Sequence, residues 1–216
     1  MNHLAHLALA CRTPIGAAGT GADAALLVGG FLGDFVKGPM RGERPEAIEL
    51  GIRLHRAIDA ETARDPDILC SVRRFGPDLR RLAPILVDIV GDHLLANRFE
   101  QHHGQPLPAF SAAAFATLRD HRTWLPEDAR LLGDRLEAWD GLVAYRGTDV
   151  VERGFARIAQ RLRRPELSGL AIDCMHEQLP ALHVDFARYY PRLQQFVVVW
   201  LSQAGGQLPA SRAPRT

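Results

Sequence analysis

The chain is poor in cysteine and lacks the cysteine spacing of metal or disulfide sites. Its 216 residues include three cysteines, Cys11, Cys70 and Cys174, which are odd in number and far apart. Without a CxxC pair, the sequence favours neither a thiolate zinc site nor a disulfide framework. We therefore expect a protein of the reducing cytoplasm.

Long apolar runs and a strong net charge are also missing. The longest apolar run near the C-terminal end, FVVVWL from Phe196, is far shorter than the ~20 residues of a membrane span. The opening MNHLAHLALAC lacks a basic region, and His6 interrupts its apolar stretch, which argues against an export signal. A formal net charge of +1 gives no overall attraction to nucleic acid. We expect a soluble protein whose partners are neither membranes nor nucleic acids.

Alternating β-branched runs bounded by hairpin turns are absent, whereas apolar positions recur every three or four residues. This periodicity predicts an all-α fold, with one domain over 1–204 and a disordered tail over 205–216. Proline and glycine positions bound the expected helices. These are 2–10, 22–36, 45–64, 66–75, 83–101, 109–121, 126–145, 148–163, 165–189 and 191–203.

The sequence contains no GxSxG, P-loop or GxGxxG motif. The commonest serine hydrolases and nucleotide-binding folds are therefore excluded. What the sequence has instead is ionisable residues on apolar helix faces, where an unpaired charge costs several kcal/mol.

The expected helix 45–64 places His55 and Asp59 one turn apart on the face that carries Ile48 and Ile52. The expected helix 83–101 places Asp88 and Asp92 on one stripe with Ile85 and Leu95. Asp34 follows Leu27 and Phe31 on the helix 22–36, and His6 lies among leucines. Four helices thus direct potential metal ligands inward.

Mixed imidazole and carboxylate ligands favour Mn²⁺, Fe²⁺ or Mg²⁺ over a closed structural zinc site. For any single residue, a buried ion pair or a hydrogen-bonded core histidine is an equally good interpretation. For the whole set, this structural interpretation is weaker, because one basic partner cannot compensate the charge of four carboxylates.

Four segments resemble, in order, the signatures of the acyl carrier protein phosphodiesterase family. They are NHLAH at 2–6, GDFVKG at 33–38, GIRLHRAID at 51–59 and DIVGDHLL at 88–95, and the resemblance extends over roughly 1–201. Two features depart from the family pattern. His3 stands where an aromatic residue is usual, and the loop between Cys11 and Leu27 is longer.

The resemblance implies an HD-domain-like helical bundle that uses manganese, with Mg²⁺ or Fe²⁺ as alternatives. Its reaction would hydrolyse the phosphodiester of holo acyl carrier protein, releasing 4'-phosphopantetheine and apo acyl carrier protein. Asp59 or Asp88 would act as general base or orient His55, and Lys37 and Arg56 would contact phosphate oxygens. The candidate metal ligands are His6, Asp34, His55, Asp92 and His93.

Two other functions fit the same residues. The first is an HD-type phosphohydrolase acting on a nucleotide, which a turnover screen would distinguish. The second is a non-catalytic helical binding protein in which the inward polar residues form a structural network, and metal content would distinguish that one.

Two basic groups are candidates for docking the strongly acidic carrier protein. One contains Arg73, Arg74, Arg80 and Arg81, which precede the Asp88 helix, and the other contains Lys37, Arg41 and Arg44, which follow Asp34. We expect the first group to dock the carrier protein.

Overall fold

The chain folds as a series of helices of very different lengths. The structure, a computed structural model, describes residues 2–11 and 21–205. Within those ranges there are eleven α-helices, one 3₁₀ helix and no strand, which confirms the predicted all-α fold. The elements are α1 His3–Ala10, α2 Gly21–Leu32, α3 Glu46–Thr62, α4 Pro66–Arg74, α5 Ala83–Asn97, α6 Phe99–His103, α7 Leu107–Asp120, η1 Arg122–Trp124, α8 Glu127–Ala138, α9 Gly141–Ala144, α10 Thr148–Arg161 and α11 Leu167–Gly205.

Three sequence predictions stay outside what this structure tests. Residues 12–20 of the long loop and residues 206–216 of the expected tail lie outside the described residues, whereas Gly205 is the last residue of α11. The HD-type arrangement of the helices stays a prediction. Among the described helices, none is both long and apolar enough to cross a membrane.

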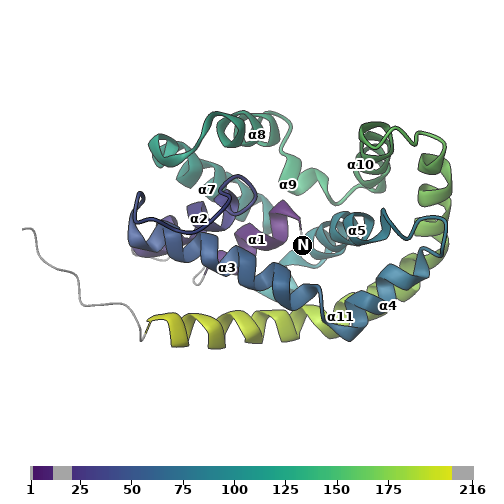
Figure 1. The fold of residues 1–216 in the computed structure, drawn as a ribbon, viewed down its shortest axis with the longest axis horizontal. Coiled ribbons are helices and arrows are strands. Elements are labelled where there is room, and N and C mark those ends of the chain that lie inside the picture. The colour runs from purple at the N-terminus through teal and green to yellow at the C-terminus, as the bar shows by residue number, and fades with distance from the viewer. Residues whose placement is uncertain (1, 12–20, 206–216) are drawn as a thin grey trace, which may run out of the picture.

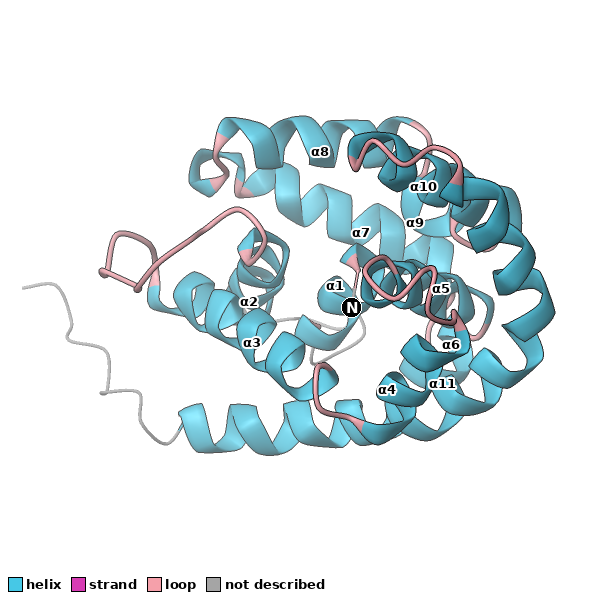
Figure 2. Cartoon of the chain, turned by 45° about the vertical axis from the view of Figure 1, so that its right-hand side comes forward, coloured by secondary structure: helices cyan, strands magenta, loops and turns pink. Residues whose placement is uncertain are grey.

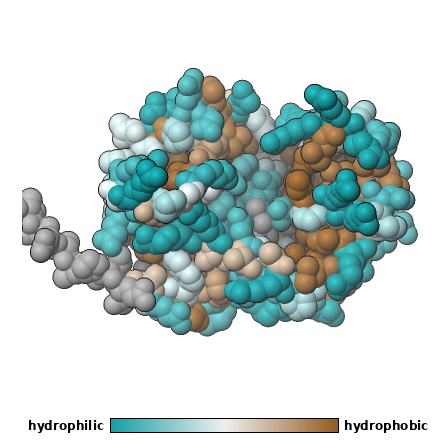
Figure 3. Space-filling model, in the orientation of Figure 1, coloured by the Kyte–Doolittle hydropathy of each residue, from teal (hydrophilic) through white to brown (hydrophobic). Residues whose placement is uncertain are grey.

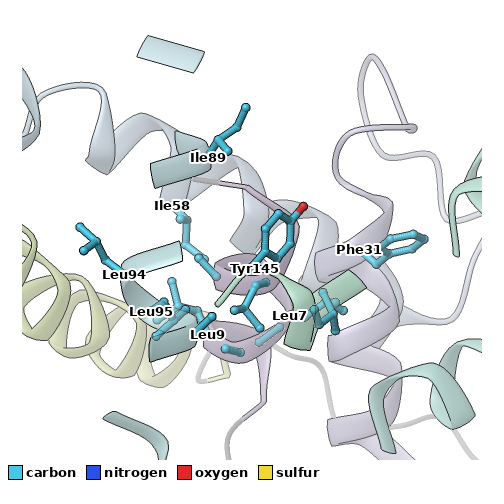
Figure 4. Packing of buried hydrophobic residues seen from close by; sticks show 14 of the residues in the cluster. Leu7, Leu9, Phe31, Ile58, Ile89, Leu94, Leu95 and Tyr145 are labelled. Atoms are coloured by element: carbon cyan, nitrogen blue, oxygen red, sulfur yellow. The ribbon is translucent and has the colours of Figure 1, made fainter. Parts of the chain in front are cut away.

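Helix α1 lies in the middle of the molecule and is almost wholly buried. Figure 1 shows α2 and α3 on one side of it, α5 on the other, and the long α11 along the lower edge. Leu7 and Leu9 of α1 lie between Phe31 of α2 and Leu95 of α5 (Figure 4). Because α1 is surrounded in this way, its polar residues are positioned by three neighbouring helices.

The N-terminus of α1 is capped from another helix. Asn2, at the N-cap position, makes no side-chain cap. Instead, the carboxylate of Asp92 on α5 accepts hydrogen bonds from the backbone N–H groups of Leu4 and Ala5, at 2.9 and 3.0 Å. A carboxylate at a helix N-terminus satisfies otherwise unpaired donors and interacts favourably with the helix dipole.

Helices α2 and α3 pack unusually closely because glycines face each other at their crossing. A Cβ atom on Gly29 would lie 2.1 Å from the Ile48 carbonyl oxygen, and one on Gly51 would lie 2.2 Å from the Leu26 carbonyl oxygen. Such contacts involve rigid backbone, so a side chain at either position would force the helices apart. The close crossing holds the end of α2 against the middle of α3.

Several helix boundaries differ from the predicted ones. Helix α2 ends at Leu32 rather than Val36, because the N–H groups of Phe35 and Val36 both bond to the Leu32 carbonyl and close the last turn. The predicted helix 83–101 is divided into α5 and α6 at Arg98, which has a non-helical backbone (φ −126°, ψ 19°).

The predicted helix 126–145 is also wrong, since it is divided into α8 and α9. Asp140 adopts a left-handed backbone conformation (φ 48°) between them, and its Oδ1 accepts a hydrogen bond from Ser111. A left-handed residue interrupts a right-handed helix, and aspartate tolerates this conformation better than most residues.

The two helices predicted at 165–189 and 191–203 form the single helix α11, with Pro180 and Pro191 inside it. Proline in a helix interior costs about 3 kcal/mol. The buried stripe compensates for this cost, because Phe186 and Tyr190 stack at 5.0 Å and the stripe continues past Pro191 through Leu193 and Val197. Packing therefore overrides the local break signal.

Candidate metal centre

Three ionisable side chains on α1 and α3 lie close enough together to share one cation. They are His6 of α1 and His55 and Asp59 of α3, and one ligand atom from each lies within 4.8 Å of the others. His55 and Asp59 are one turn apart on α3, and their nearest atoms, Nε2 and Oδ2, are 3.3 Å apart. The rings of His6 and His55 stack, with centroids 3.6 Å apart and planes inclined by 14°.

Asp34 adds a fourth group from the turn after α2. Its Oδ1 lies 3.6 Å from His55 Nε2, and its Oδ2 lies 3.7 Å from His3 Nδ1. The side chains of Asp34 and Asp59 are half exposed, whereas those of His6 and His55 are 3% exposed. The group therefore has a buried imidazole side and an open carboxylate side.

The orientation of His55 is fixed by the neighbouring helix. Its Nδ1 lies 2.8 Å from the Gly30 carbonyl oxygen of α2, so this nitrogen carries the proton and donates the hydrogen bond. Nε2 is then directed at the carboxylates, as second-shell partners commonly arrange for metal-binding histidines. Gly33 makes room for this ring, because a Cβ there would lie 2.1 Å from His55 Cγ.

His6 is buried without a hydrogen bond. Its Nε2 lies 3.1 Å from Asp59 Oδ1, but without hydrogen-bond alignment. Among the described residues, neither ring nitrogen of His6 has a hydrogen-bond partner. Buried polar groups are normally satisfied, so an unsatisfied pair needs an explanation. Coordination of a cation is one that fits this position.

The pKa values of the group are strongly coupled. Burial lowers the pKa of His6 to about 4. Burial also opposes a charge on His55, but interactions with Asp34 and Asp59 outweigh it and raise the pKa of His55 to about 9. Burial favours the neutral acid, but His55 and His6 lower the pKa of Asp59 against it. The neighbouring His55 also lowers the pKa of Asp34. Without a metal, a proton on His55 thus links the two carboxylates.

The predicted ligands Asp92 and His93 lie elsewhere. Both oxygens of Asp92 are engaged by the N-terminus of α1, and burial raises its pKa to about 7. His93 Nδ1 lies 2.8 Å from the carbonyl oxygen of Tyr145, on the α9 side of α5. The structure does not bring these two residues into the group formed by His6, Asp34, His55 and Asp59.

The three remaining predicted site residues are outside this group, on α5, on α3 and in the segment after α2. Asp88 is partly buried on α5; burial raises its pKa, and the charges of Asp59 and Asp34 raise it further. Arg56 Nη2 donates a hydrogen bond to the Val36 carbonyl oxygen at 2.8 Å, and Lys37 follows Val36 as an exposed residue. Arg56 therefore holds the segment after Asp34.

Sequence reasoning missed His3 as a member of this site. It was recognised only as a departure from a family pattern, although it precedes His6 by three residues and so lies on nearly the same helix face. Taken together, two to three imidazoles and two carboxylates form a donor set that fits a divalent metal of intermediate hardness.

Comparisons with known proteins assign the chain to a family. The family described as "Acyl carrier protein phosphodiesterase" matches residues 1–193. The chain belongs to the acyl carrier protein phosphodiesterase family.

Curated relatives carry the same description. A protein of Serratia proteamaculans is 32% identical over 200 residues, which cover 90% of this chain and 96% of the relative. A protein of Salmonella dublin is 33% identical over 199 residues, covering 89% and 95% of the two chains. The Escherichia coli O6:H1 protein is 30% identical over 205 residues, covering 90% and 96%. No solved structure matches the chain.

Proposed function

We propose that this chain hydrolyses the phosphodiester of holo acyl carrier protein and releases 4'-phosphopantetheine and apo acyl carrier protein. Family membership over most of the chain supports the choice of substrate. The observation that carries the chemistry is the buried His6, whose ring nitrogens have no partner among the described residues, stacked on His55 and next to Asp59.

The site would hold a divalent metal between His6, Asp34, His55 and Asp59. Mixed nitrogen and oxygen donors favour Mn²⁺, with Mg²⁺ or Fe²⁺ as alternatives. Such a metal supplies Lewis acidity toward a phosphoryl oxygen and a nucleophile at neutral pH. The half-exposed carboxylates leave the site open on the side from which a large protein substrate must approach.

The chain's own residues would position the substrate and move the proton. Asp88 is the better group for proton transfer, because burial raises its pKa while that of Asp59 is lowered. Lys37 is exposed three residues after Asp34 and would contact a phosphate oxygen. Arg56 would act as a positioning residue, because it holds Val36, the neighbour of Lys37.

The test is conversion of holo to apo acyl carrier protein by protein stripped of metal and then supplied with Mn²⁺. We expect activity only with the metal, and loss of nearly all activity and metal binding in Asp59→Asn. Asp120→Asn, which changes an exposed carboxylate at the end of α7, is the matched control and should behave as the native chain.

Mass spectrometry of the carrier protein identifies the bond that is cut. We expect an unmodified serine, with the phosphate leaving on the pantetheine. A phosphoserine product would place the cleavage at the other ester bond and contradict the proposed reaction. Full activity after removal of the metal would contradict the proposed centre.

A further inference from the structure

A pocket of about 360 Å³ lies next to the candidate metal centre. Its walls come from the segment 35–44 between α2 and α3, from Glu49 in the first turns of α3, and from Pro126 before α8. Figure 2 shows the loop between α2 and α3 projecting beyond the ends of both helices. A larger pocket, of about 460 Å³ around His102 and Gln194, includes no residue of the segment that follows Asp34.

The smaller pocket and the metal centre are built on the same two elements. Phe35, in the pocket wall, follows Asp34 directly, and Val36 is bonded to Arg56, the neighbour of His55. Glu49 precedes His55 by six residues on α3, which is about 9 Å along the helix axis. A ligand with its phosphate at the metal centre could therefore extend into this pocket.

Glu49 is the unusual member of the pocket wall. It is 7% exposed, yet no hydrogen bond or ion pair joins its carboxylate to any part of the chain that the structure describes. Lys37, Arg41 and Arg44 line the same pocket, but Arg44 lies against Glu43 instead, at 4.0 Å. The oxygens of Glu49 are not among the fully buried side-chain atoms that lack a partner, so they open into the pocket, where a donor that arrives with a ligand can reach them.

The charges around Glu49 indicate which kind of ligand group could donate a hydrogen bond to its carboxylate. Three cationic side chains line the same pocket against the two carboxylates of Glu43 and Glu49, and this excess of positive charge disfavours a bound metal ion or ammonium group. They leave a neutral amide N–H or hydroxyl as the better partner for the carboxylate. A pantetheine arm carries both kinds of donor along a flexible chain that begins at the phosphodiester.

We propose that this pocket binds the pantetheine arm of the holo carrier protein, with Glu49 accepting a hydrogen bond from one of its amide or hydroxyl groups. This inference rests on the proposed function and adds a residue that determines specificity. Glu49 would favour a phosphodiester with this arm over one without it, because only the arm brings a donor to this carboxylate.

The experiment compares two substrates in three variants. Glu49→Leu removes the acceptor, Glu49→Gln keeps a weaker neutral one, and Glu46→Leu changes an exposed carboxylate one turn earlier as the control. With holo carrier protein, we expect kcat/KM to fall roughly tenfold or more in Glu49→Leu and less in Glu49→Gln. With bis(4-nitrophenyl) phosphate, which lacks the arm, all three variants should match the native chain.

Equal losses with both substrates would overturn the inference, because Glu49 would then act through the fold or the metal centre. Unchanged kinetics with holo carrier protein would overturn it as well. Binding of free 4'-phosphopantetheine, followed by NMR shifts of the 35–44 amides, separates the two proposals. If the native chain binds free 4'-phosphopantetheine but cleaves no carrier protein, only the proposed function is refuted. If it cleaves the carrier protein but the 35–44 amides show no shifts, the proposed pantetheine pocket is refuted.

Discussion

His55 is the residue on which the electrostatics of the metal-free site depend. Its Nε2 faces Asp34 at 3.6 Å and Asp59 at 3.3 Å, while its Nδ1 is held by Gly30. These carboxylates raise the pKa of His55 to about 9 against the opposing effect of burial, from an ordinary value of 6.5. A metal that binds here must displace that proton, so metal affinity should increase with pH.

The same pKa shift predicts how stability depends on pH. Between about pH 6.5 and 9 the folded chain binds a proton at His55 that the unfolded chain does not, so this contribution is complete below pH 6.5 and lost as pH rises through 9. We expect the melting temperature of the metal-free protein to fall by a few degrees between pH 7 and 9.5. The fall should be smaller in His55→Gln; an identical fall in both would show that other groups cause it.

The position of Asp92 predicts that its substitution reduces stability rather than removing a metal ligand. Asparagine keeps one acceptor oxygen and turns an NH₂ group toward the second of the two α1 donors, leaving a buried N–H unsatisfied. We expect Asp92→Asn to lower the free energy of unfolding by roughly 1–3 kcal/mol, measured by urea denaturation. The half-exposed Asp34→Asn serves as comparison and should lose metal with little change in stability. Native stability in Asp92→Asn would contradict the capping role.

Sequence periodicity predicted His55 and Asp59 together because they belong to one helix face. It also placed Asp88 and Asp92 on one inward stripe, and the family resemblance added His93, but an inward direction does not say which neighbour a side chain meets. Helix α5 faces the N-terminus of α1 on one side and Tyr145 on another, so Asp92 and His93 have different partners. Glu49 was not found, because its pocket exists only once the loop before α3 is folded.

At the scale of elements, the crossing of α2 and α3 positions the site. Asp34 follows the end of α2, and His55 and Asp59 lie on α3, so their separation depends on how closely these helices approach. That approach depends on Gly29 and Gly51, which are too crowded for any side chain. The sequence shows both glycines, but which backbone each one meets follows only from the tertiary structure.

We predict that Gly51→Ala separates the helices and damages the site. A methyl group there would meet the Leu26 carbonyl oxygen at 2.2 Å, and overpacking of this kind costs typically 1–3 kcal/mol. Urea denaturation should show this loss, and metal affinity should fall with it. Gly21→Ala is the control, since no described residue lies within 4 Å of a Cβ at the start of α2, and it should be neutral. Equal stability of the two variants would contradict the close crossing.

The helix α11 shows where local signals mislead at this scale. Proline predicted a boundary near 190, yet the buried stripe of Phe186, Tyr190 and Leu193 continues across it. By contrast, the start of α4 was predicted well, because Asp65 caps it through Asp67 N and Ile68 N and Pro66 begins it. Caps are local and readable in sequence, whereas long-range packing is not.

At the scale of the whole molecule, the surface combines a small net charge with unevenly distributed polar and apolar areas. Figure 3 shows hydrophilic residues over much of one face, with most of the apolar surface on its right-hand half. The formal charge of +1 means that an acidic partner must be attracted by a local basic group. The two basic groups identified from the sequence differ in how free their side chains are.

In the first group, at positions 73, 74, 80 and 81, one arginine already pairs with a buried carboxylate of the fold. Arg74 Nε lies 2.7 Å from Asp185, a carboxylate that is 1% exposed and also accepts a hydrogen bond from Ser71. Reversing the charge of Arg74 would leave Asp185 buried beside a like charge, so this variant would report on folding. In the second group, Lys37 and Arg41 are exposed and belong to the loop that begins beside Asp34.

We therefore predict that the acidic carrier protein docks on the group after Asp34. Arg41→Glu combined with Arg44→Glu should raise the KM for holo carrier protein severalfold at low salt, and less at high salt, where exposed charges are screened. Arg80→Glu combined with Arg81→Glu makes the same change in net charge with two exposed residues of the first group, and it should have the smaller effect. Steady-state kinetics at two ionic strengths decide between them, with bis(4-nitrophenyl) phosphate, which lacks the acidic protein partner, as the reference substrate. A larger effect of the Arg80 and Arg81 variant would move the docking surface to the loop between α4 and α5.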